Sequence, residues 1–367
     1  MLLALFSCRE DDIIFIPEEV PTGTPVLSDV RGFYLLNEGN MGSNKSTLDY
    51  YNLLTATYFR NIYASANPSV PKELGDVGND LGVYGSKLYA VINCSNKVEV
   101  MRADDAVRIS SIEIPNCRSI AFHGGYAYVT SYAGPVEIRP DYSQLGFVAK
   151  IDTVTLQVVD RCIVGYQPDG LAVSGDNIYV ANSGGYRVPN YENTLSVISL
   201  ASFSVTKTIA IAPNLDNVIA DRHGRIWVSN RGDYYDVMPS LTCYDTRKNR
   251  IVATFPIGAS AMWLDDDTLY TVGTSWSAET QSNVRSYHKI DIEALQIEEK
   301  GPITDGTETE IRVPYAIAVN PVTKEIYITD ARSYLNPGYL HCYSPEGIRQ
   351  WSVRTGDIPA AFAFIGQ

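Results

Sequence analysis

The stretch Asn177–Leu200, NIYVANSGGYRVPNYENTLSVISL, contains two short runs of β-branched and apolar residues with a polar loop between them. Runs of this kind are typical of β-strands. The loop, residues 183–193, carries two tyrosines, an arginine and a proline, where a tight hairpin needs only Gly or Asn. The loop is therefore larger and more aromatic than the turn alone requires.

The first run of this stretch recurs along the chain. Its seven copies lie 39 to 57 residues apart and share an aromatic residue at one position. These aromatic residues are Tyr34, Tyr89, Tyr128, Tyr179, Trp227, Tyr270 and Tyr327. A period in the forties with several short strands per unit is typical of a β-propeller.

Each unit has the same internal order. A small apolar strand such as GLAVS (170–174) leads through a tight turn into the aromatic strand, and two further strands follow a loop of variable length. This order predicts an all-β fold, a seven-bladed β-propeller over residues 31–367 with four antiparallel strands in each blade. The first unit lacks its first strand, and IPAAFAFIGQ (358–367) looks like such a strand with nothing after it. We expect the C-terminal strand to join blade one and close the ring.

The N-terminus, MLLALFSCREDD, has a short apolar run that ends in a small residue before Cys8. This pattern resembles a bacterial lipobox and predicts a signal remnant at 1–8, an acylated Cys8 and a Pro-containing tether at 9–30. The acidic residues after the cysteine resemble a surface-export signal of lipoproteins in one group of Gram-negative gut anaerobes. The expected location is therefore the outer membrane, facing the exterior. The alternative is an ordinary apolar N-terminus with a chance cysteine.

Composition excludes some partners and sites. The net charge of -13 argues against nucleic acid and against an anionic membrane surface, since both need a basic protein face. Besides Cys8 there are five widely spaced cysteines, which form neither a disulfide framework nor a zinc pattern, although Cys94 and Cys117 are a candidate pair. The four histidines have no ligand spacing, and GxSxG and HExxH motifs are absent. We therefore predict no metal, no cofactor and no catalytic residues.

The residues that end the second strands are all short and polar. In a propeller, the loops after the second and fourth strands of each blade lie on one face, around the central channel. The seven strand-end residues are Asn37, Asn93, Ser131, Asn182, Asn230, Thr274 and Asp330. Such side chains either fold back onto loop backbone or offer donors and acceptors to a ligand at the mouth of the channel.

The loops beyond these residues are rich in aromatic rings, whereas the turns expected on the other face are short. Tyr and Trp combine rigid contact area with a polar tip, which suits recognition, although rings can also simply pack loops together. Arginines near the strand ends could bind amide or phosphate oxygens or pair with nearby aspartates. The predicted ligand-binding residues are Asn37, Asn93, Arg118, Tyr132, Asp169, Asn182, Tyr186, Asn230, Arg231, Tyr234, Tyr235, Trp276, Asp330, Arg332 and Tyr334.

The units resemble the YVTN-type propeller repeat, of which IYVANSGGYRV…NTLSVISL is a fair copy. The segment LLNEGNMGSNKSTLDYYN (35–52), together with the lipobox and the CREDD start, resembles surface lipoproteins of the BtuG type. That resemblance implies capture of cobalamin on the loop face and transfer to a TonB-dependent outer-membrane transporter. It also implies contacts from Asn37, the other strand-end polar residues and the loop tyrosines.

Three classes of function stay open at this point. The leading one is a non-enzymatic, monomeric, lipid-anchored protein that captures a corrinoid. The second is a scaffold for proteins or a surface layer, for which the same tyrosines would serve. The third and weakest is a propeller hydrolase or lyase, in which Asp169, Asn217 and Asp80 near the axis would hold a cation.

Overall fold

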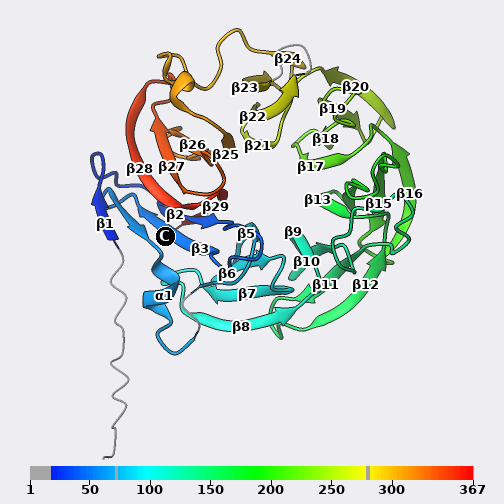
Figure 1. Cartoon of the computed structure of the whole chain (residues 1–367), viewed down its shortest axis with the longest axis horizontal. Coiled ribbons are helices and arrows are strands. Elements are labelled where there is room, and N and C mark those ends of the chain that lie inside the picture. The colour runs from blue at the N-terminus through cyan, green and yellow to red at the C-terminus, as the bar shows by residue number, and fades with distance from the viewer. Residues whose placement is uncertain (1–17, 71–72, 278–281, 367) are drawn as a thin grey trace, which may run out of the picture.

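The computed structural model describes residues 18–70, 73–277 and 282–366, without the side chains of 276, 277, 282 and 283. It shows seven antiparallel sheets arranged in a ring around a central axis (Figure 1). The expectation of an all-β, seven-bladed propeller is therefore confirmed. The predicted lipidation site, Cys8, lies outside the described residues.

The first blade joins the two ends of the described chain. From the axis outward its strands are β29 (Pro359–Gly366), β2 (Val30–Asn37), β3 (Thr47–Asn52), β4 (Thr57–Arg60) and β1 (Glu18–Pro21). β29 pairs antiparallel with β2, so the C-terminal strand closes the ring as expected. β1 pairs with β4 and adds a fifth, outermost strand. The blade therefore takes in part of the segment 9–30 that the sequence predicted as a tether.

The other six blades each have four strands in chain order from the axis outward. Blades two to four consist of β5 (Gly78–Tyr84), β6 (Lys87–Ile92), β7 (Lys97–Arg102), β8 (Arg108–Glu113), β9 (Cys117–His123), β10 (Tyr126–Ser131), β11 (Phe147–Asp152), β12 (Val158–Ile163), β13 (Pro168–Ser174), β14 (Asn177–Asn182), β15 (Thr194–Ser199) and β16 (Ser204–Ala210). Blades five to seven consist of β17 (Leu215–Ala220), β18 (Arg225–Asn230), β19 (Ser240–Asp245), β20 (Arg250–Phe255), β21 (Ala261–Asp265), β22 (Thr268–Ser277), β23 (Ser282–Asp291), β24 (Gln296–Ile297), β25 (Pro314–Val319), β26 (Ile326–Asp330), β27 (Pro337–Tyr343) and β28 (Arg349–Asp357). The short helix α1 (Ile62–Ala66) connects the first two blades, and the 3-10 turn η1 (Thr307–Glu310) precedes the last one.

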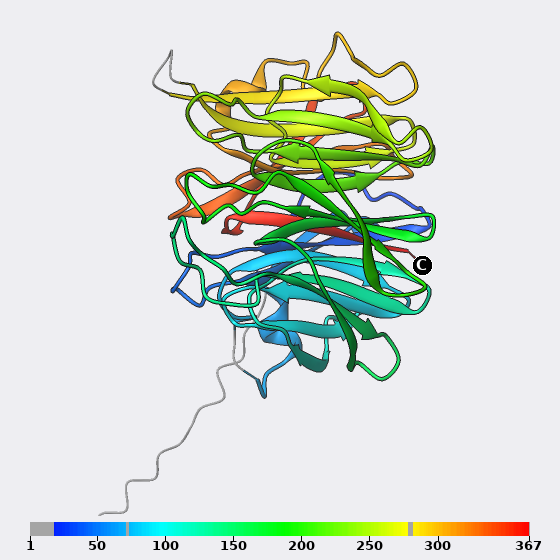
Figure 2. The same cartoon turned by 90° about the vertical axis from the view of Figure 1, so that its right-hand side faces the viewer.

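This strand order gives the ring two different faces. The loops after the second strands and the loops between blades share one face, which we call the loop face, and the tight turns share the other. Figure 2 shows the ring from the side, with the C-terminus on the face opposite the loop face. The long aromatic loops therefore emerge on a single face.

The aromatic residue of each repeat holds neighbouring blades together. Tyr34, Tyr89, Tyr128, Tyr179, Trp227, Tyr270 and Tyr327 are all buried. Each lies in an apolar cluster with residues of the next blade, as Trp227 does with Leu269 and Tyr327 with Phe33. A buried side chain of this size stabilises the fold by roughly 1.5–3 kcal/mol, so the repeated residue contributes to the packing between every pair of neighbouring sheets.

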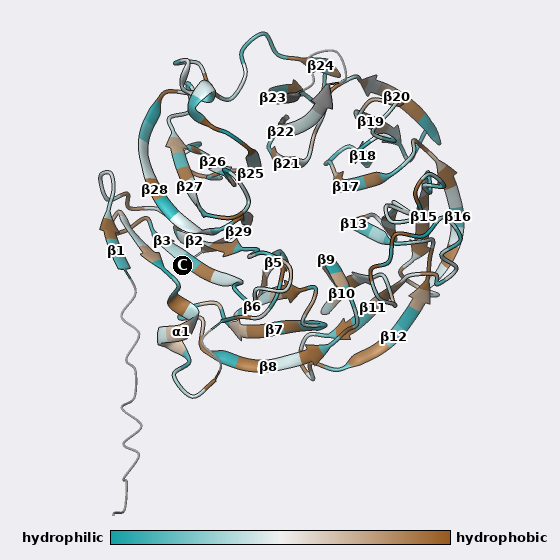
Figure 3. Ribbon diagram, in the orientation of Figure 1, coloured by the Kyte–Doolittle hydropathy of each residue, from teal (hydrophilic) through white to brown (hydrophobic). Residues whose placement is uncertain are grey.

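Alternation within the strands decides which side chains enter these clusters. Hydrophobic and hydrophilic residues follow one another along the outer strand β8 (Figure 3), whereas the second strand β14 is buried over most of its length. An outer strand has one solvated face, and a second strand is covered on both. The core therefore forms between blades and leaves the axis to the inner strands.

The cysteines and helices add no covalent or membrane-spanning element to the described chain. Cys94, Cys117, Cys162, Cys243 and Cys342 are free thiols, so the candidate pair of Cys94 with Cys117 is not formed. Within residues 18–70, 73–277 and 282–366, no helix has the length and apolar character that a bilayer crossing requires.

His341 in β27 makes stability depend on pH. It is 7% exposed, its Nδ1 lies 2.7 Å from Ser352 Oγ, and burial lowers its pKa from 6.5 to about 4. Between pH 4 and pH 6.5, His341 is therefore protonated in the unfolded chain and neutral in the native protein. This contribution to stability is complete above pH 6.5 and is lost as the pH falls through 4.

We expect the free energy of unfolding of the native protein to fall, relative to that of His341→Gln, by roughly 2–3 kcal/mol between pH 7.5 and 4.5. Urea titrations of both proteins at the two pH values measure this difference. Other titrating groups are common to both proteins and cancel. If the free energies of unfolding of the two proteins change equally between these pH values, then folding does not lower the pKa of His341.

Candidate functional site

A repeated irregularity in the inner strands builds the site. In six blades the pairing between the inner and second strands shifts register close to the loop face. A β-bulge of this kind re-aims a side chain. The second residues of the six inner strands are Asn79, Arg118, Asp169, Asp216, Tyr315 and Ala360, and all but Ala360 are polar.

In three of the six blades a hydroxyl group of the second strand, from Thr130, Ser229 or Thr329, binds backbone next to the bulge. Thr130 Oγ1 accepts a hydrogen bond from Ser119 N at 3.0 Å and donates one to the carbonyl of Asp169 at 2.7 Å. Thr329 makes the same two kinds of contact in the last blade. Each of these two threonine hydroxyls thereby fixes the start of its own inner strand relative to the next one, which holds the axial side chains in place.

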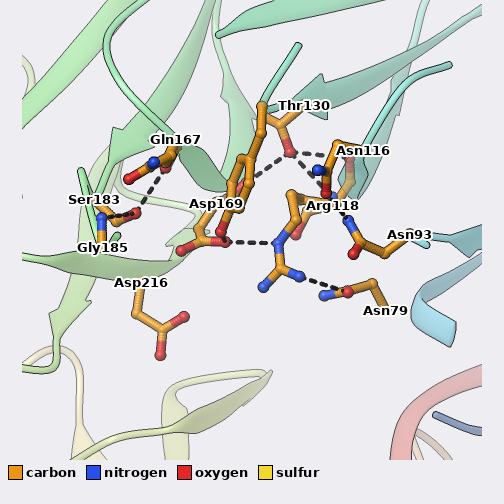
Figure 4. Close-up of polar contacts among 12 residues, drawn as sticks. Asn79, Asn93, Asn116, Arg118, Thr130, Gln167, Asp169, Ser183, Gly185 and Asp216 are labelled. Atoms are coloured by element: carbon orange, nitrogen blue, oxygen red, sulfur yellow. Dashed lines mark hydrogen bonds and ion pairs between the residues drawn. The ribbon is translucent and has the colours of Figure 1, made fainter. Parts of the chain in front are cut away.

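Asp169 lies at the centre of a buried charge network. Its Oδ1 accepts hydrogen bonds from Arg118 Nε at 2.9 Å and Tyr132 Oη at 2.7 Å, and its Oδ2 accepts one from Arg231 Nη1 at 3.0 Å. Arg118 Nη1 also donates to Asn79 Oδ1 at 2.7 Å (Figure 4). Arg118, in the third blade, therefore binds a residue of the second blade and a residue of the fourth. Four of the predicted site residues, Arg118, Tyr132, Asp169 and Arg231, thus share one carboxylate-centred cluster.

The carboxyl groups around the axis differ in their proton affinity. Burial opposes ionisation of Asp169, but Arg118 and Arg231 outweigh it and lower the pKa to about 2. Burial raises the pKa of Asp216 to about 6 although Arg231 opposes the shift, and burial also raises the pKa of Asp80 to about 6. Asp169 is therefore charged at any physiological pH, whereas the other two titrate near pH 6.

The axial cavity, of about 360 Å³, opens around this network. One wall is polar and comes from β5, β9, β13 and β17, and the other is largely apolar and comes from β21, β25 and β29. The polar wall consists of Asn79, Asp80, Arg118, Ser119, Asp169, Asp216 and Asn217, and Glu38 and Arg231 extend it at the loop face. The apolar wall includes Ala261, Met262, Trp263, Ala316, Ile317, Ala361 and Phe362. The channel therefore suits a group that is polar on one side only.

The rim cavity, of about 300 Å³, adjoins the axial cavity on the loop face between blades five, six and seven. Its lining combines aromatic and apolar side chains, among them Tyr234, Tyr235, Val237, Met238, Pro239, Pro314, Tyr315 and Tyr334. Asp216, Arg231, Ser260 and Tyr315 line both cavities. Together the two cavities offer an apolar mouth with a charged end.

The predicted site residues divide into three groups by position. The rim cavity is lined by Asn230, Arg231, Tyr234, Tyr235 and Tyr334, and the axial network contains Arg118, Tyr132, Asp169 and Arg231. Neither cavity is lined by Asn37, Asn93, Asn182, Tyr186, Asp330 or Arg332. Trp276 lies in β22, but its side chain lies outside the described part of the structure.

Most strand-end residues bind neighbouring strands or loop backbone, which is the alternative to ligand contact that the sequence left open. Asn182 donates from Nδ2 to Thr194 and Ser196, and Asp330 accepts backbone hydrogen bonds from Val313 and Arg332. Asn37, Asn93, Asn182, Asn230 and Asp330 are at most 4% exposed. Their polar groups are therefore directed at loop backbone or neighbouring strands.

Among the site residues that were not predicted are Glu38, Asn79, Asp216 and Tyr315. Tyr315 donates from its hydroxyl to Glu38 Oε2 at 2.5 Å and packs against Tyr334 with ring centroids 6.0 Å apart. Three of the four occupy the second position of an inner strand. That position, just before the small apolar run of each unit, is a sequence feature that could have located them.

One group of three possible metal ligands occurs among the described residues. It consists of His223, Asp267 and Glu293, which the scattered histidines of the sequence did not predict. Arg222 forms ion pairs with both carboxylates, so a cation is already present there. Asp169 and Asp80, proposed from the sequence as cation ligands, belong to no such group among the described residues.

Several solved structures have a similar architecture at low sequence identity. Hydrazine synthase from Kuenenia stuttgartiensis is 14% identical, with a TM-score of 0.60, covering 77% of this chain and 88% of that one. A quinonprotein alcohol dehydrogenase-like protein from Bacteroides thetaiotaomicron is 12% identical, with a TM-score of 0.62 and coverage of 92% and 79%. The Pan2 WD40 domain of Neurospora crassa is 10% identical, with a TM-score of 0.52 and coverage of 79% and 80%. At these identities the likeness shows the propeller fold alone.

No curated protein matches the chain. A family profile does match it, over residues 31–344, and its description is "Domain of unknown function (DUF5074)". The matched range covers most of the propeller, from the second strand of the first blade into the third strand of the last. The chain therefore belongs to the family of the domain of unknown function DUF5074.

Proposed function

We propose that this propeller is a non-enzymatic capture protein that binds a small, ring-bearing and amide-rich ligand on its loop face. The observation that carries the proposal is the pair of adjoining cavities, an aromatic one at the rim and a charged one at the axis, which share Asp216, Arg231 and Tyr315. A preformed, largely apolar cavity with a few converging polar groups is the usual form of a small-molecule site.

The charged network favours binding over catalysis. Although burial opposes ionisation, Arg118 and Arg231 stabilise the ionised form of Asp169 and lower its pKa to about 2, so this carboxylate is a weak base towards a substrate proton. The hydrogen bonds of this network hold its side chains in place, so these side chains lose little conformational entropy when a ligand binds, which favours affinity.

Within this class we propose a corrinoid such as cobalamin as the ligand. Its amide arms, which both donate and accept hydrogen bonds, match the mixed donors and acceptors of the axial cavity, and its planar ring system matches the tyrosines of the rim. With acylation at Cys8, the chain would hold the ligand at the outer membrane for transfer to a TonB-dependent transporter.

Calorimetric titration of the purified chain with cyanocobalamin tests the ligand. We expect a submicromolar dissociation constant and at least a tenfold loss of affinity in the double variant Tyr234→Ala, Tyr235→Ala, since each ring provides hot-spot contact area. Val154→Ala, at an exposed apolar residue in a tight turn of the opposite face, should bind like the native protein. A native dissociation constant in the micromolar range or weaker rejects this ligand.

A protein partner is the second candidate, and the exposure of the rim favours it. Tyr234, Tyr235 and Met238 are 56%, 76% and 55% exposed, and Leu335 is 75% exposed. Exposed aromatic and Met side chains of this kind are typical of protein interfaces. Co-purification of a protein with the native chain but not with the double tyrosine variant, without cyanocobalamin binding, would favour the scaffold function.

A further inference from the structure

We propose that the two cavities form one bipartite site that selects for hydrogen-bond donors: an aromatic ring enters the rim cavity, and an ammonium or primary amide group on a short arm binds Asp216 and Glu38 in the axial cavity. The inference rests on the proposed function only in taking these cavities as the place where a ligand binds. It does not depend on the ligand's being a corrinoid.

The first step is the balance of charge in the axial cavity. Four carboxylates line it, those of Glu38, Asp80, Asp169 and Asp216, against two guanidinium groups, those of Arg118 and Arg231. When all of them are ionised, the lining carries an excess of two negative charges. In a partly desolvated cavity such an excess attracts donors and cations and repels a carboxylate.

The second step is which groups are still free. Arg231 uses Nη1 on Asp169 and Nη2 on Asp216 Oδ1, at 3.0 and 2.6 Å, so its terminal nitrogens are engaged by the protein itself. Arg118 uses Nε on Asp169 and Nη1 on Asn79, which leaves only its Nη2 without an acceptor among the described residues. Both oxygens of Asp80 accept backbone hydrogen bonds, from Leu81 and Ile120.

Two carboxylate oxygens remain without a donor among the described residues. Oδ2 of Asp216 accepts no hydrogen bond, and Glu38 accepts one only at Oε2, from Tyr315. Both residues line the axial cavity, and neither of these two oxygens is completely buried. Each oxygen is therefore open to a ligand. A carboxylate accepts hydrogen bonds and donates none, so the complementary group is an N–H donor.

The third step is the junction between the cavities. Asp216 and Tyr315 line both cavities, so the charged axial cavity begins directly where the aromatic rim cavity ends. Figure 4 shows Asp216 next to the pair formed by Arg118 and Asp169 at the axis. Tyr315 is placed by its hydroxyl on Glu38 and by its ring against Tyr334. A ligand that spans the junction therefore needs a ring and a donor separated by a short linker.

Three indoles with the same ring and a two-carbon linker test the proposal: tryptamine, indole-3-propionamide and indole-3-propionate. Saturation-transfer NMR titrations with the full chain give the relative affinities. We expect tryptamine and the amide to bind, and the carboxylate to bind at least about tenfold more weakly than tryptamine. Equal or tighter binding of the carboxylate would overturn the proposal, as would the absence of binding by tryptamine and the amide.

Substitutions assign the preference to the two carboxylates. Asp216→Asn and Glu38→Gln keep side-chain size and should each reduce the preference for tryptamine over the carboxylate severalfold. Asp267→Asn, which removes a carboxylate paired with Arg222 away from both cavities, should leave the preference unchanged. Thermal melting of each variant shows that it is folded. A preference that survives in both Asp216→Asn and Glu38→Gln would contradict the assignment.

The outcomes separate this inference from the corrinoid proposal. If the indoles behave as expected and cyanocobalamin does not bind, the donor-selective site stands and the proposed ligand falls. If cyanocobalamin binds tightly while the indole series shows no preference for donors, the capture function stands and the donor selectivity falls.

Discussion

Asp169→Asn is expected to lower the free energy of unfolding by about 3–5 kcal/mol, the cost of removing one partner from a buried ion pair. The substitution leaves Arg118 and Arg231 without the carboxylate that both of them bind, and it replaces an acceptor of the Tyr132 hydroxyl. The Asp169 side chain is 5% exposed, so water cannot take over these contacts. A denaturant titration of both proteins at neutral pH measures the difference.

The pH dependence of this difference provides a second check. The pKa of Asp169 is lowered from 3.8 to about 2 in the fold, so its contribution is complete above pH 3.8 and is lost as the pH falls towards 2. The native protein and the variant should therefore converge in stability over this range. Asp141→Asn, at an exposed partner of Arg139, should leave the free energy of unfolding close to that of the native protein. An equally small effect at Asp169 would show that the network is not needed for stability.

Removal of residues 358–367 is expected to abolish cooperative folding. β29 is the innermost strand of the first blade, and Phe362 and Ile365 are buried in the clusters on its two sides. Each such side chain contributes roughly 1.5–3 kcal/mol, and the unpaired edge of β2 adds a further cost. Their sum is comparable with the roughly 5–15 kcal/mol by which whole domains are stable.

Urea titrations followed by tryptophan fluorescence, with circular dichroism, measure this effect. We expect the shortened chain to show no cooperative transition and a synthetic peptide of residues 358–367 to restore one, since an extended peptide can add to an open sheet edge. Ala360→Ser, at a residue of β29 that lines the axial cavity, should unfold like the native protein. A shortened chain with the native midpoint would show that the ring does not need closure by β29.

The sequence was sufficient to predict the ring, because its main determinants are local and repeated. The aromatic position of each unit, from Tyr34 to Tyr327, recurs in every blade and is buried between blades in every case. The unpaired apolar segment at the C-terminus predicted the pairing of β29 with β2. β1 was not predicted, because a strand of four residues, Glu18–Pro21, has no apolar alternation and forms only by pairing with β4.

The site was predictable only in part. Arg118, Asp169 and Arg231 follow from their place at the ends of strands, and the structure joins them in one network. Asp216 and Tyr315 were missed although their place just before the small apolar run of each unit could have located them, because the direction of their side chains depends on a register shift between two strands. Asn182 illustrates the opposite difficulty, since the same side chain suits a ligand or a loop, and only its partners Thr194 and Ser196 distinguish the two.

The bulged position of each inner strand has a consequence for how this architecture can diversify. The register shift occurs whether this position holds Arg118 or Ala360, so the bulge does not require one particular side chain. Substitution at this position alters the chemistry around the central axis and leaves the apolar clusters between the blades unchanged. Relatives with this scaffold would then acquire new molecular preferences by exchanging a handful of these axial residues, without having to re-evolve the blades.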